Sequence, residues 1–374
     1  MANLYDYIKQ YGNDDFDKTP LNDIDHMVFC SMAYVDLKQY MPKKRFETIT
    51  LGEVSKKYFD NYKKKDHKYN ISAHVHGIKT LKAIKSKKRY KNIEIYNYRS
   101  KENDSKQFCA MTMRFHGYTY VLFEGTNHLL SGWEEDFKMS YSFPVPSHKE
   151  AIRYLNRTIK RSDENIIVCG HSKGGNLALV SSMYCHEFIK RRIKKIYNLD
   201  GPGLREKQFN TKRYEEISDR LVTIVPNYSV IGTLLKSDEY KVVKSPRVTI
   251  MSHDLASWEI KGTHIVKTKL SKFSEKFDKY MDDFVKINGD KMMKKYVKVI
   301  FGLLRQAGID SLEKINAAKL RGTIKLIKIT TEFDDDTKKM AIDFMNFMLK
   351  NYSMAAYDKV KTWIPKVKKE KVKV

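Results

Sequence analysis

One stretch of the chain, Asn165 to Ala178, constrains the fold more than any other, and it reads N-I-I-V-C-G-H-S-K-G-G-N-L-A. It opens with a short, largely β-branched apolar run, Ile166 to Cys169, which is typical of a buried parallel strand. Gly170 to Gly174 then fits the pattern G-x-S-x-G, and apolar residues at helical spacing follow. Strand, tight turn and helix together predict a nucleophile elbow with Ser172 at the turn.

The small residues around Ser172 have a physical reason. We expect this serine in a strained backbone conformation, and a side chain at Gly170 or Gly174 would clash with the neighbouring strand or helix. The helix that follows brings its free N–H groups beside the hydroxyl, where they can stabilise an oxyanion.

Strands and helices alternate on both sides of this stretch. Residues 108–123 alternate in polarity around a His116-Gly117 turn and predict a β-hairpin. A capping box from Ser147 to Glu150 begins a helix that leads to the elbow strand. Further strands are expected at residues 195–199, 221–225 and 248–251. This order predicts the α/β class, with a mainly parallel sheet flanked by helices.

The chain divides by composition into two parts. Residues 1–260 carry the strand-and-helix pattern and form the expected hydrolase-type domain. Within it, residues 41–105 are lysine-rich, include the cluster Lys63 to Lys65, and predict an insert of helices and loops. Residues 261–374 predict a helical appendage with Phe and Met stripes that we expect to be core, and its end, Pro365 to Lys371, should fray.

A serine hydroxyl needs a base to take its proton, and the base is normally a histidine oriented by a carboxylate. In this architecture the chain order should be serine, acid, histidine. His253 follows the last expected strand and is the predicted base. The predicted acid is Asp200, in the Gly/Pro turn that closes the strand after the elbow helix. The alternative acid is Asp238, in the loop between the last two strands. His171 is expected to pack behind the elbow.

An oxyanion hole needs two donors. One should be the backbone N–H of Lys173, the residue after the nucleophile. The other should come from the loop after an earlier strand, where Gly125-Thr126 stands. Thr126 can offer both its backbone N–H and its hydroxyl.

These motifs together resemble the α/β-hydrolase superfamily, most closely its fungal-type (class 3) lipase-like branch, and more narrowly a bacterial lipase-like family of unknown function. The resemblance implies Ser172 as nucleophile, Thr126 as oxyanion residue and His253 as base. Class 3 lipases usually carry their acid where this chain has Pro226-Asn227, whereas an acid at Asp200 resembles the pancreatic-type arrangement. The segments that carry the resemblance are Asn3–Ile8, Asp23–Asp36, Gly125-Thr126, Trp133–Phe137, Gly170–Ala178, Asp200–Gly203 and His253–Trp258.

Composition indicates the compartment and the partners that we expect for the protein. The excess of 71 Lys and Arg over 45 Asp and Glu gives a net charge of +26. This charge suggests contact with an anionic membrane surface, or only a solvated basic surface, and no nucleic-acid module is recognisable. The four cysteines lack a C-x-x-C and predict reduced core residues of a cytoplasmic protein. His74 and His76 would share a strand face, but without a nearby acidic or cysteine partner we expect no metal site.

The sequence therefore predicts a cytoplasmic serine hydrolase, peripheral at the membrane at most, that cleaves a carboxylic ester of a lipid or another acyl substrate without a cofactor. The alternative is a catalytically silent protein of the same fold that binds an anionic membrane or a protein partner. We expect no leader peptide, since residues 1–10 have no apolar core, and no run of about 18 apolar residues that could span a bilayer.

Overall fold

The structure is a computed structural model that describes residues 1–62, 72–103, 106–127, 129–311, 314, 317–329, 334–339, 341–343 and 345–346. The predictions that concern Lys63 to Lys65 and the end from Pro365 lie outside the described residues.

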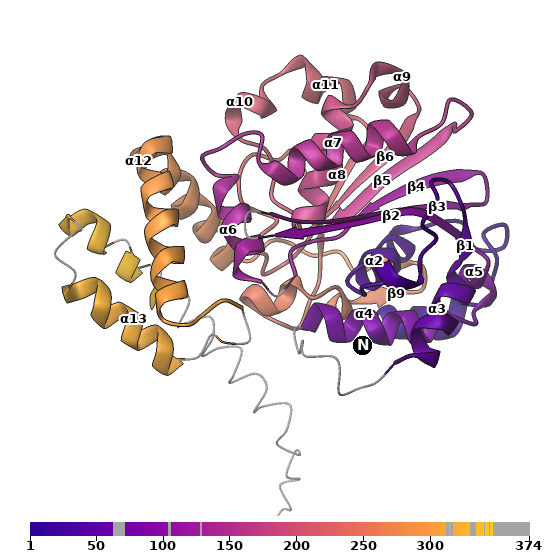
Figure 1. Cartoon of the computed structure of the whole chain (residues 1–374), viewed down its shortest axis with the longest axis horizontal. Helices are drawn as coiled ribbons and strands as arrows, with labels where there is room; N and C mark the ends of the chain where they lie inside the picture. The colour runs from indigo at the N-terminus through magenta and orange to yellow at the C-terminus, as the bar shows by residue number, and fades with distance from the viewer. Residues whose placement is uncertain are drawn as a thin grey trace, which may run out of the picture.

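An eight-stranded sheet forms the centre of the molecule, and its strands lie side by side in chain order (Figure 1). Neighbouring strands from β1 to β4 run antiparallel, and those from β4 to β8 run parallel. The strands are β1 (Ile49–Thr50), β2 (Glu94–Asn103), β3 (Lys106–Phe115), β4 (Tyr118–Phe123), β5 (Asn165–His171), β6 (Ile193–Leu199), β7 (Leu221–Pro226) and β8 (Lys241–Val243). The predicted α/β fold, with a mainly parallel sheet flanked by helices, is confirmed.

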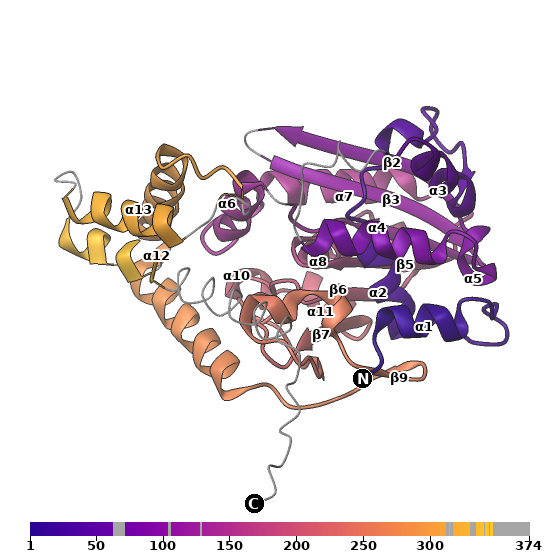
Figure 2. The ribbon, with the colours of Figure 1, turned by 90° about the horizontal axis from the view of Figure 1, so that it is seen from below.

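Helices cover both faces of this sheet (Figures 1 and 2). One face carries α7 (Pro146–Thr158) and α8 (Lys173–Tyr184), with α9 (Glu187–Lys190), α10 (Glu206–Phe209) and α11 (Lys212–Ser218) on the same side of the molecule. The other face carries α1 (Leu4–Tyr11), α2 (Asp23–Met32) and α4 (Ser72–Ile84), with η1 (Lys38–Tyr40), α3 (Leu51–Asp60) and α5 (Lys88–Lys91) nearby.

The elbow strand β5 shows why both faces are covered. Its residues alternate between the two sides, so that Ile166 and Val168 enter the core under α8 while Ile167 and Cys169 enter the core under α2. All four side chains are buried, as the continuous apolar run predicts. The parallel pairing aligns Phe123 with Gly170 and His171 with Leu199. The carboxyl ends of β4, β5 and β6 therefore meet at one edge of the sheet.

Two expectations about the strands were wrong. The predicted insert at residues 41–105 is not only helical, because β1 and β2 extend the sheet there. The predicted strand at residues 248–251 is a 3-10 helix, η3 (Thr249–His253), and the last strand of the eight-stranded sheet is β8 instead. Thr249 has a φ of 51°, a left-handed conformation that breaks an extended chain, and its carbonyl accepts a hydrogen bond from the Ser252 hydroxyl at 2.7 Å.

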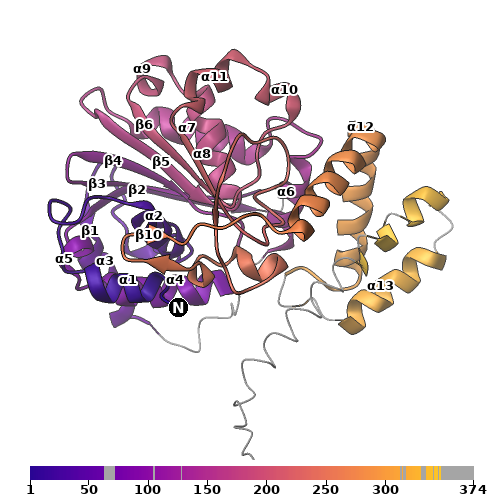
Figure 3. The ribbon, with the colours of Figure 1, turned by 180° about the vertical axis from the view of Figure 1, so that it is seen from behind.

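The last described part of the chain is helical and packs beside α6 (Leu130–Lys138), as Figures 1 and 3 show. It follows η4 (Leu255–Ser257) and the short pair β9 (Ile260–Lys261) and β10 (His264–Ile265). It contains α12 (Lys272–Gln306), which kinks at Gly289, and α13 (Ala317–Ile329). The predicted apolar stripe of Met293, Tyr296, Val297, Ile300 and Leu304 is buried in a core shared with Leu130.

None of the helices within the described ranges combines the length and the apolar character that crossing a bilayer requires.

Candidate active site

Ser172 stands at the turn between β5 and α8, where the G-x-S-x-G pattern predicts it. Its φ of 57° is the left-handed conformation that marks a strained turn, and its N–H donates to the Leu199 carbonyl at 2.9 Å. A β-carbon at Gly170 would lie 2.2 Å from the Gly174 carbonyl, and one at Gly174 would lie 2.3 Å from the Phe123 carbonyl. Only glycine fits at either position, as expected from the sequence.

His253 and Asp200 are hydrogen-bonded partners. The His253 Nδ1 lies 2.6 Å from the Asp200 carboxylate, although 53 residues separate them in the chain. The other carboxylate oxygen accepts hydrogen bonds from the Ser229 hydroxyl at 2.5 Å and from the Gly232 N–H at 3.1 Å. Asp200 is fully buried, so these contacts fix its orientation. An Nδ1–H that donates to Asp200 leaves the His253 Nε2 unprotonated and able to accept a proton.

Asp238, the other acid that the sequence allowed, is engaged elsewhere. Its carboxylate accepts a hydrogen bond from the Tyr214 hydroxyl of α11 at 2.5 Å. The structure thus brings Asp200, and not Asp238, to His253.

His171 does more than pack behind the elbow. Its Nε2 lies 2.9 Å from the His253 carbonyl, its Nδ1 lies 2.7 Å from the Tyr34 hydroxyl, and the two imidazole rings are 4.4 Å apart. Nε2 must donate to the carbonyl, so Nδ1 accepts from Tyr34. Burial lowers the pKa of His171 well below its usual range, and the charge of nearby His253 lowers it further. Neutral His171, the residue before Ser172, therefore links the elbow to the backbone of His253.

The Gly125-Thr126 loop lies against Ser172, where the second oxyanion donor is expected. A β-carbon at Gly125 would lie 3.0 Å from that of Ser172. The Thr126 hydroxyl, however, donates to the Asp136 carboxylate at 2.6 Å, which leaves its backbone N–H as the remaining candidate oxyanion donor. Burial raises the pKa of Asp136 to about 6. Its second oxygen is buried without a hydrogen-bond partner among the described residues.

Lys173 offers only its backbone to the site. Its N–H belongs to the first turn of α8, where helix N–H groups have no partner within the helix. Its ammonium group is fully buried and donates to the carbonyl and side-chain oxygens of Gln107 at 2.9 and 2.8 Å. It also lies 3.4 Å from the Glu135 carboxylate. The side chain thus ties the elbow to β3 and α6.

Sequence reasoning missed three residues that support this site: Gln107, Glu135 and Asp136. The Gln107 amide donates to the Gly125 carbonyl at 3.0 Å, and Glu135 accepts from the Ser147 N–H at 2.9 Å. The Trp133 to Phe137 motif was a visible signal, but the sequence alone assigns no partner to its acids.

The two histidines of the A-H-V-H-G segment do not share a strand face, because the segment is part of α4. His74 Nδ1 lies 3.0 Å from the Tyr34 carbonyl, whereas His76 contacts the Tyr5 hydroxyl at 2.7 Å and Asp254 at 3.3 Å. Across the described residues no cluster of three or more His, Cys, Asp or Glu side chains is placed to hold a metal ion.

Comparison with known proteins shows the family to which the chain belongs. Residues 84–302 match the family described as Mbeg1-like, and this segment is more than half of the chain. The chain belongs to the Mbeg1-like family. In this Mbeg1-like chain, the matched segment runs from the last residue of α4 into α12 and includes all the predicted site residues.

One solved structure, described as the crystal structure of M37 lipase, is similar to this chain. The two share 14% sequence identity over 72% of this chain and 81% of the lipase chain, with a TM-score of 0.37. No curated protein matches the chain.

Proposed function

We propose that this Mbeg1-like chain is a serine hydrolase that cleaves carboxylic esters of a lipid or another acyl substrate. The proposal rests above all on the 2.6 Å hydrogen bond between His253 and Asp200. His171, the residue before the elbow serine Ser172, also contacts the His253 carbonyl at 2.9 Å. Ser172 is the nucleophile, His253 the general base and Asp200 the orienting acid.

In the first step the Ser172 oxygen attacks the ester carbonyl while the His253 Nε2 takes the hydroxyl proton. The carbonyl oxygen becomes an oxyanion, which the backbone N–H groups of Lys173 and Thr126 stabilise. Asp200, with its carboxylate held by Ser229 and Gly232, stabilises the imidazolium without taking a proton from it.

Collapse of this intermediate breaks the ester bond, and His253 returns its proton to the leaving alcohol. Water then attacks the acyl-enzyme with the same histidine as base, and the acid and free Ser172 are released. The chemistry requires no cofactor. The proposed site of action is cytoplasmic, with membrane contact at most peripheral.

The test is the initial rate of hydrolysis of p-nitrophenyl esters, from acetate to palmitate, by the wild type and Ser172→Ala. Ser172→Ala should lose all measurable turnover, whereas Ser218→Ala, a matched change at an α11 serine, should keep the wild-type rate. Activity retained by Ser172→Ala would reject the proposal. A folded wild type that hydrolyses none of the esters would favour the silent binding protein instead.

A further inference from the structure

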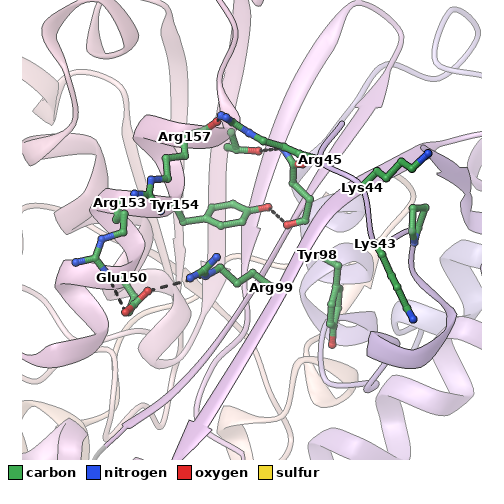
Figure 4. A pocket seen from close by; sticks show the side chains of 12 residues that line it. Lys43, Lys44, Arg45, Tyr98, Arg99, Glu150, Arg153, Tyr154 and Arg157 are labelled. Atoms are coloured by element: carbon green, nitrogen blue, oxygen red, sulfur yellow. Dashed lines mark hydrogen bonds and ion pairs between the residues drawn. The ribbon is translucent and has the colours of Figure 1, made fainter. Parts of the chain in front are cut away.

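A second concave site lies outside the proposed catalytic centre. It is an open cavity of about 520 Å³ between the loop at residues 42–45, strand β2 and helix α7 (Figure 4). Glu150, Arg153, Tyr154 and Arg157 line it from the α7 side, and Lys43 and Lys44 line it from the loop (Figure 4). None of the catalytic or oxyanion residues borders it. A cavity of this volume is in the range that small ligands occupy in proteins.

The cavity is built around an irregularity in β2. The pairing of β2 with β3 shifts register between Tyr96 and Arg99, and Asn97 in the shifted segment has a φ of 52°. The Asn97 side chain accepts from the Phe46 N–H at 2.9 Å and donates to the Thr158 hydroxyl at 2.8 Å. Its carbonyl accepts from the Tyr154 hydroxyl at 3.0 Å. One residue therefore connects all three elements around the cavity.

The loop at residues 42–45, which lines the cavity opposite α7, is held by further contacts. The Arg45 guanidinium donates to the Arg157 carbonyl of α7. The charged groups of Arg45 and Lys160 lie 4.5 and 4.3 Å from the centre of the Phe46 ring. The loop thus holds its basic side chains at the rim of a preformed cavity.

Most of the charged side chains that line the cavity are cationic. Six cationic side chains line the cavity against one carboxylate, Glu150. Glu150 already pairs with Arg153 at 2.9 Å, with Arg99 at 4.0 Å and with Lys101, outside the lining, at 2.9 Å. The six cations are Lys43, Lys44, Arg45, Arg99, Arg153 and Arg157.

Four of these cations, Lys43, Lys44, Arg45 and Arg157, have no acidic partner within the described part of the chain, and Arg45 donates to the Arg157 carbonyl instead. The charged groups of Lys43, Lys44 and Arg157 make no ion pair or hydrogen bond with any described residue. Like charges held together in a concave surface repel one another, and a bound anion relieves that repulsion. Guanidinium groups match phosphate oxygens in shape as well as in charge.

We propose that this cavity binds a ligand bearing two or more phosphate groups. A single phosphate would neutralise fewer charges than the lining offers. A second hollow shares Arg153 and Arg157 with the cavity and adds Lys149 of α7 and His186, the residue before α9. This hollow leaves room for a further phosphate group. The ligand's source is either a free phosphorylated compound or the headgroup of an anionic lipid.

The test uses inorganic tripolyphosphate as the probe and isothermal titration calorimetry as the readout. The wild type should bind the probe, and the triple variant Lys43→Gln, Lys44→Gln, Arg157→Gln should bind it at least about tenfold more weakly. A control with the same loss of charge, Lys207→Gln, Lys212→Gln, Lys261→Gln, changes exposed lysines on α10, α11 and β9. The control should bind within about twofold of the wild type. Thermal unfolding of both variants verifies that they fold.

Vesicles containing phosphatidic acid separate the two sources. A lipid headgroup as ligand predicts flotation with the vesicles that tripolyphosphate displaces and that only the cavity variant loses. A free phosphorylated ligand predicts tripolyphosphate binding that depends on the cavity, and vesicle binding that is absent or equal in both variants. Binding of neither probe to the wild type, or equal weakening of tripolyphosphate binding in both triple variants, would overturn the proposal.

Discussion

The replacement Asp200→Asn tests the assignment of the acid with little change in shape. The Asp200 carboxylate accepts from His253, Ser229 and Gly232. An asparagine oxygen can still accept from Ser229 and Gly232, so its amide nitrogen must then face His253. Because that nitrogen donates, it selects the His253 tautomer with Nδ1 unprotonated and Nε2 protonated, which cannot take the serine proton. We expect kcat to fall by about 10⁴-fold, or about 5.5 kcal/mol of transition-state stabilisation.

The assay is the steady-state rate on an ester that the wild type hydrolyses, with Asp238→Asn as the matched control. Asp238 contacts Tyr214 rather than His253, so its replacement should change kcat by less than about threefold. KM should stay close to the wild-type value in Asp200→Asn, since Asp200 is buried behind the histidine. A larger loss in Asp238→Asn than in Asp200→Asn would refute the reasoning.

Three further predictions concern the surroundings of Ser172. Gly174→Ala should lower the free energy of unfolding by at least about 2 kcal/mol in a denaturation assay, because the added β-carbon would meet the Phe123 carbonyl. The control Gly302→Ala should be neutral or stabilising in the same assay, because there is open space around Gly302. His171→Phe should reduce kcat by about tenfold to 100-fold with little change in KM, because it removes the hydrogen bond to the His253 carbonyl. A variant that loses stability but keeps the wild-type kcat would contradict this. Burial raises the pKa of Asp136 to about 6, so the contribution of Asp136 to the unfolding free energy should fall as pH rises from about 4 to 6. Asp136→Asn should remove that fall, and its gain over the wild type in urea titrations should be larger at pH 8 than at pH 5; a pH-independent gain would reject the role of its charge.

The sequence was most informative where local geometry sets the residue type. The glycines around Ser172 are required by contacts that leave no room for a β-carbon, so a short motif is enough to locate the turn. The rule that parallel strands end at one edge then brought His253 and Asp200 into consideration. The sequence favoured Asp200 but did not exclude Asp238, because both follow strands and only their distance to His253 separates them.

The errors have physical causes as well. The apolar run from Val248 to Met251 has strand propensity, but the left-handed turn at Thr249 folds it into η3, from which His253 reaches Asp200. Strand β2 was missed because its register shift at Asn97 interrupts the alternation that would have marked it. The partners of Glu135 and Asp136 depend on contacts across α6, β3 and α8, which no local pattern records.

Fluorophosphonate labelling tests the central claim most directly, because the probe reacts with a serine only when a base has activated it. The modified peptide is identified by mass spectrometry in the wild type and in His253→Ala. We predict a single label on Ser172, and a large loss of that label in His253→Ala. A folded wild type that takes no label, a label on another serine, or equal labelling of both proteins would contradict the account.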